Sequence, residues 1–90
     1  MIEVNRVSDG DPMSFEVTIS EGGGSSKHQV TMGAEQYERL CGESSPEACL
    51  EAAFRFLLDR EPKEAIMGKF DVTVIAKFFP EFESKIGDYL

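Results

Sequence analysis

Histidine and cysteine, the soft metal ligands, are scarce in this 90-residue chain, which has one histidine and two cysteines. His28, Cys41 and Cys49 could supply at most three soft ligands, and their spacing matches no zinc pattern. A catalytic histidine also needs a nucleophile, an orienting acid and an oxyanion site, and the sequence proposes none of them. We therefore predict no metal site, no cofactor and no catalytic residue, and we favour a non-enzymatic protein.

Positive charge is in short supply. The chain has 9 Lys and Arg against 17 Asp and Glu, which gives a formal net charge of −8. Nucleic-acid binding needs clustered positive charge and counterion release, so it is disfavoured. An acidic exterior instead favours association with basic proteins.

Long apolar runs are missing as well. No stretch reaches the roughly 18 to 20 apolar residues that span a bilayer, and Glu51, Arg55 and Asp59 interrupt the longest helical pattern. The first residues lack the basic and apolar segments of a secretory signal, so we expect a cytoplasmic protein with no membrane partner. In that reducing compartment, Cys41 and Cys49 are expected to be free thiols that pack as small core residues.

Hydrophobic residues nevertheless make up 41% of the chain, and they include seven Phe. This content is typical of a packed core rather than of an acidic disordered chain. No internal repeat or interdomain linker is visible, so residues 1–90 are predicted to form one small domain.

The first third of the chain has the alternation of strands. Phe15, Val17 and Ile19 alternate with polar residues, and the segment 27–32 alternates again after a Gly- and Ser-rich stretch. We expect a hairpin with a loose loop, since the glycines join strand to strand and lack the lysine of a phosphate-binding loop. Residues 2–7 suggest a third antiparallel strand.

Helical spacing follows. A short helix is expected over 33–41 with Gly42 at its end, and Ser45 and Pro46 are a strong start for a second helix that runs to about Arg60. A further turn is expected over 62–67. Residues 72–79 fit both helix and strand periods; we prefer a helix because Asp71 stands where an N-cap should. Pro80 then precedes a last short helix.

These elements predict an α+β fold, in which an N-terminal antiparallel two- to three-stranded meander packs against three to five C-terminal helices.

The second half of the chain, from Glu51 to Ile66 and then through Phe70, Asp71 and residues 74–83, resembles a group of short uncharacterised bacterial proteins. The resemblance extends back through the hairpin. It implies a bacterial cytosolic origin and carries no activity, cofactor or partner with it.

Six of the seven Phe lie between positions 54 and 82, more than a small helical half hides easily. Such a surplus is what an interface anchor or a peptide-binding groove would supply. Our leading hypothesis is a non-enzymatic protein-interaction module, acting as a homodimer or on another protein. The nominated surface residues are Phe56, Phe78, Phe79 and Phe82.

The alternative is a small-molecule binding domain or minor enzyme, with a pocket between sheet and helices near His28, Tyr37 and Cys41. His28 is otherwise interpreted as a half-buried strand residue. A third possibility, an antitoxin-like regulator, has only the order of its elements in its favour and would need a basic patch.

Overall fold

A four-stranded sheet with the order β1-β2-β3-β4 forms one layer of the fold. The computed structural model describes all residues, 1–90. The strands are β1 (Ile2–Ser8), β2 (Met13–Glu21), β3 (Gly24–Met32) and β4 (Lys69–Asp71). The first three pair antiparallel, as predicted, and β4 adds a parallel edge strand that the sequence pattern did not reveal.

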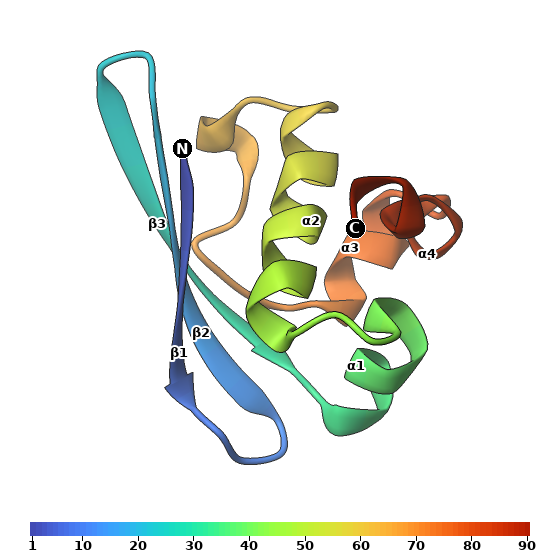
Figure 1. The fold of residues 1–90 in the computed structure, drawn as a ribbon. Coiled ribbons are helices and arrows are strands. Elements are labelled where there is room, and N and C mark those ends of the chain that lie inside the picture. Colours follow the sequence, from blue (N-terminus) through green and yellow to red (C-terminus); the bar gives the residue numbers. More distant parts are fainter.

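Four α-helices and two 3₁₀ turns form the other layer, all on one side of the sheet (Figure 1). The α+β prediction is therefore confirmed. The helical elements are α1 (Ala34–Cys41), α2 (Pro46–Leu58), the turn η1 (Lys63–Ala65), α3 (Thr73–Phe78), α4 (Phe82–Lys85) and the turn η2 (Ile86–Tyr89).

The turn between β2 and β3 is tighter than the loose loop expected from the sequence. Glu21 pairs with Gly24, so only Gly22 and Gly23 connect the strands. Both glycines have positive φ, 62° and 80°, which is the geometry of a two-residue type I′ turn. This backbone matches the right-handed twist of the strands, which explains why the ladder continues to the tip.

Helix α2 begins where the sequence indicates. The Ser45 side chain accepts a hydrogen bond from the Ala48 amide at 3.1 Å, and Pro46 fills the first position, where no amide partner is needed. Arg6 of β1 donates two hydrogen bonds to Glu47, at 2.7 and 2.9 Å, and thereby holds the start of α2 beside the sheet. These hydrogen bonds lower the pKa of the Glu47 carboxyl below its usual value.

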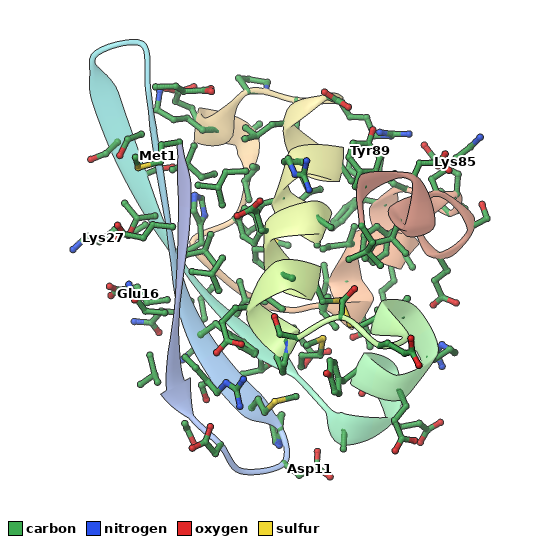
Figure 2. The ribbon with its side chains drawn as sticks, in the orientation of Figure 1. Met1, Asp11, Glu16, Lys27, Lys85 and Tyr89 are labelled. Carbon is green, nitrogen blue, oxygen red and sulfur yellow. A yellow bond between two sulfur atoms is a disulfide. The ribbon has the colours of Figure 1, made fainter.

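The core lies between the layers. Alternate residues of β2 face the helices and are buried, while the intervening ones face outward. Glu16 and Lys27 are on that outward face and project away from the helices (Figure 2). One side of the sheet is therefore bare and polar. The segment 72–79 is helical over Thr73–Phe78, which confirms the preference for a helix.

Candidate interaction groove beside α3

An apolar groove of about 270 Å³ opens beside α3. Its walls come from the C-terminal end of α2, the segment from η1 to β4, and α3 itself. Nine of its ten lining residues are hydrophobic, and the tenth is Glu61. The apolar members are Leu57, Ala65, Ile66, Met67, Phe70, Val74, Ile75, Phe78 and Phe79.

The short helix α3 supplies the outer wall. Ile75 points into the core and is buried, whereas Val74 and Phe78, four residues apart, share the side that lines the groove. Phe78 is 68% exposed, and Met67 across the groove is 43% exposed. Single exposed apolar side chains are common on protein surfaces, but two large ones beside the same groove are unusual.

Two of the four nominated phenylalanines lie in the core, and this corrects the prediction for them. Phe56 and Phe82 are both 0% exposed, and their rings meet edge to face with centroids 5.0 Å apart. The Arg60 guanidinium covers the other side of Phe56, 3.6 Å from the ring centroid. Because both rings are closed off, neither can contact a partner without unfolding.

The other two nominees stay at the surface. Phe79 is half-buried, with its ring against Phe56 at 6.0 Å, and Phe78 stands out from α3. The structure thus brings Phe78 and Phe79 together at the groove. No sequence pattern pointed to Met67 or Glu61 as groove residues, and Val74 was indicated only by its four-residue spacing from Phe78.

Glu61 is the one charged residue in the groove wall, and its carboxylate forms no ion pair. The two cationic residues nearest to Glu61 in sequence are already paired with other carboxylates. Arg60 binds Glu81 at 3.1 Å, and Lys63 binds Glu64 at 2.8 Å. A positive group that enters the groove therefore finds a free negative charge.

His28 is not part of the groove but binds the backbone of Met67, one of the residues that line it. It is 2% exposed, and its Nδ1 lies 2.7 Å from the carbonyl oxygen of Met67 while its Nε2 lies 2.8 Å from the Ser26 hydroxyl. A carbonyl oxygen can only accept, so the hydrogen-bond network assigns the proton to Nδ1. The ring also packs against Phe54, with centroids 5.5 Å apart. His28 thus fixes the segment that leads into β4.

The structure shows no cavity lined by His28, Tyr37 and Cys41, the residues of the alternative pocket. Tyr37 donates a hydrogen bond to the Ser44 carbonyl at 2.6 Å, and Cys41 is buried. None of the three lines either of the two cavities in the structure. Each of these side chains instead has a partner elsewhere: Tyr37 and His28 bond to backbone carbonyls, and Cys41 is joined to Cys49.

The prediction of two free thiols was also wrong. Cys41 and Cys49 form a disulfide, with Cα atoms 5.4 Å apart, rather than two free thiols. The turn between α1 and α2, where Gly42 has a φ of 58°, returns the chain so that the end of one helix meets the start of the other. The two cysteines belong to the core, as predicted, since each is about 1% exposed.

A second, broader concavity of about 610 Å³ lies on the bare face of the sheet. Most of its lining is polar, and Asp71 is its most constrained member. Burial alone would raise the pKa of the Asp71 carboxyl, but hydrogen bonds from Thr31 and from the amide and hydroxyl of Thr73 outweigh it and lower the pKa. Asp71 is therefore occupied in joining β3, β4 and α3.

No three His, Cys, Asp or Glu side chains lie close enough together to hold a metal ion. No helix of the fold is both long and apolar enough to cross a bilayer.

These features define a two-layer α+β domain with an apolar groove at one edge of its sheet. No protein-family model matches the chain, and neither the curated proteins nor the solved structures contain a match. The resemblance of the second half to short bacterial proteins accordingly stays a prediction.

Proposed function

We propose that this chain is a non-enzymatic protein-interaction module whose groove beside α3 receives an apolar segment of a partner protein. One observation carries the proposal: an apolar groove that is rimmed by Phe78, an aromatic side chain 68% exposed. Exposed aromatics beside a groove act as anchors at interfaces, because desolvating them on binding contributes much of the affinity.

The size of the groove favours a protein segment over a metabolite. Small-molecule sites usually occupy about 300 to 1,000 Å³ and place several convergent polar groups around the ligand. Here the volume is about 270 Å³, and Glu61 is the one lining residue that is not hydrophobic. A side chain or two of a peptide fit this space better than a whole cofactor does.

Charge favours a basic partner over a second copy of the chain. Each copy has a formal net charge of −8, so two copies repel one another at low ionic strength. The unpaired Glu61 carboxylate would meet Lys or Arg of a basic partner. We therefore favour a different protein over a homodimer, and over nucleic acid, whose phosphates carry the same sign of charge as this chain.

A displayed library of short random peptides tests the proposal. We expect it to enrich peptides that bind the native protein and that bind the Phe78→Ser variant at least about tenfold more weakly, a loss of about 1.4 kcal/mol. Val7→Ser is the matched control, because Val7 is equally exposed, at 69%, but lies outside the groove. The proposal is wrong if no peptide is enriched, or if the enriched peptides bind Phe78→Ser and native protein equally.

Sedimentation at micromolar concentration tests the homodimer separately. The proposal predicts a monomer. A dimer that Phe78→Ser dissociates and Val7→Ser does not would show that the occupant of the groove is a second copy.

A further inference from the structure

The strand β4 is an edge strand with unused backbone groups. The Gln29 amide donates to the Gly68 carbonyl at 2.8 Å, and the Val72 amide donates to the Thr31 carbonyl at 2.9 Å. In a parallel ladder with this register, Gly68, Phe70 and Val72 direct their backbone groups to β3. The amides and carbonyls of Lys69 and Asp71 therefore point away from the sheet.

This free edge adjoins the groove. Phe70 pairs with Val30, a buried residue that faces the helices, so the Phe70 side chain lies on the helix side and forms part of the groove wall. A strand added to β4 would lie about 4.7 to 4.9 Å away. Its side chains on the helix side would then enter the groove next to Phe70.

We propose that the groove's partner binds as an extended segment that adds a fifth strand to the sheet along Lys69–Asp71. This inference rests on the proposed function and specifies how the partner segment binds. Main-chain hydrogen bonds to the β4 edge supply affinity, and the groove selects the alternate side chains.

The geometry also defines the sequence of the segment. Residues that face the helices enter the groove and are apolar, and the residues between them lie beside Lys69 and Asp71 on the bare face and are polar. A Lys or Arg at the end of the apolar set would reach Glu61. The occupant is thus a basic, alternating segment of another protein rather than an amphipathic helix.

The opposite edge of the sheet lacks a matching site. Met1 and Ser20 exchange both backbone hydrogen bonds, so Ile2, Val4 and Arg6 direct their backbone groups outward from β1. The Arg6 side chain there is already bound to Glu47 and Asp9. The apolar groove does not reach that edge, and the mainly polar concavity touches β1 at Val7 alone. The edge of β1 therefore offers backbone groups without an apolar groove beside them.

Backbone methylation of the peptides tests the binding mode. Synthetic copies of the peptides enriched by the native protein are N-methylated at one position at a time. Strand addition predicts that methylation at alternate positions weakens binding about tenfold or more, because each blocked amide leaves a partner carbonyl unsatisfied. The intervening positions should change little. A run of consecutive sensitive positions, or none at all, would overturn the inference.

The variants Lys69→Pro and Lys69→Ala give the matched test on the protein side. The Lys69 amide bonds to no other strand, so proline there keeps the pairing with β3 and removes a donor from the free edge. We expect Lys69→Pro to bind the peptides about tenfold more weakly and Lys69→Ala to bind them normally. Equal binding by both variants contradicts strand addition.

The two proposals fail in different ways. If peptides bind and depend on Phe78 but ignore backbone methylation, the interaction function survives and strand addition does not. If no peptide is enriched, both are wrong. Should Lys69→Pro prove unfolded by circular dichroism, the methylation scan on native protein still decides the binding mode.

Discussion

A disulfide joins Cys41, the last residue of α1, to Cys49 in the first turns of α2. The bridge closes a short loop, with a sequence separation of 8, and both cysteines are buried. Its loss frees the turn between the two helices in the unfolded chain and leaves their junction without its covalent link.

We expect the Cys41→Ala/Cys49→Ala double variant to lose about 2 to 3 kcal/mol of unfolding free energy, the loop-entropy value for a loop of this size. Urea denaturation of native and double-variant protein measures the difference. The native protein with excess reductant is the control, and equal stability in all three samples would show that the bridge does not stabilise the fold.

The thiol state in cells also bears on location. The Cys41–Cys49 bridge predicts that both cysteines are protected from maleimide in denatured, acid-quenched cells until a reductant is added. Labelling of both cysteines without reductant would show that the bridge is absent in cells, as a reducing cytoplasm would make it.

Phe56 and Phe78 are expected to respond in opposite ways to truncation. Phe56→Ala removes a fully buried ring and should cost about 3 to 5 kcal/mol, whereas Phe78→Ala should cost less than about 1 kcal/mol because the ring is mostly exposed. Thermal or urea unfolding measures both. Similar costs at the two positions would mean that α3 packs differently from the structure described above.

Asp71 makes the stability of the fold depend on pH in the acidic range. The hydrogen bonds from Thr31 and Thr73 hold its pKa below the value of about 3.9 found in unfolded chains. The folded state then binds fewer protons, so the stabilisation is complete above that unfolded pKa and is lost as the pH falls through the folded pKa.

We expect Asp71→Asn to be less stable than the native protein near neutral pH, and the gap to narrow in strongly acidic solution. Urea midpoints measured across acidic pH test this. Asp88→Asn serves as the control, because Asp88 lies at the exposed C-terminal turn and forms no hydrogen bond through its side chain. A gap that stays constant with pH would contradict the role assigned to the Asp71 carboxylate.

The β2–β3 turn should tolerate a methyl group at Gly24 and not at Gly23. Gly23 has a φ of 80°, so Gly23→Ala should cost roughly 1 to 2 kcal/mol. At Gly24 an added Cβ would meet the Lys63 side chain at an ordinary 3.8 Å, and we expect little change. Comparable losses in the two variants, measured by thermal unfolding, would argue against the type I′ turn.

Local signals in the sequence were sufficient for most of the fold. The alternation around Val17 predicts β2, and Ser45 with Pro46 predicts the start of α2, because both features act through neighbouring residues. Strand β4 could not be predicted in this way. It has three residues, too few to show a period, and it exists because β3 offers an unpaired edge.

The candidate site could be predicted only in part, because local spacing does not show which distant segments come into contact. Spacing shows that Phe78 and Phe79 point in different directions from α3, but not which direction is solvent. Phe56 and Phe82 form one buried pair only after α4 folds back on α2, a contact between distant segments. The Cys41–Cys49 bridge likewise depends on the angle of the turn between two helices, which composition does not indicate.

The parallel pairing of β4 also makes the groove depend on contacts between residues far apart in sequence. The β1–β3 meander is built from contacts close in sequence, whereas β4 pairs with β3 across a connection that contains α1, α2 and η1. The groove and the free edge of β4 therefore both depend on the closure of this long connection. A partner that recognises both would bind only chains in which β4 is paired with β3, and it would not bind chains in which this connection is still open.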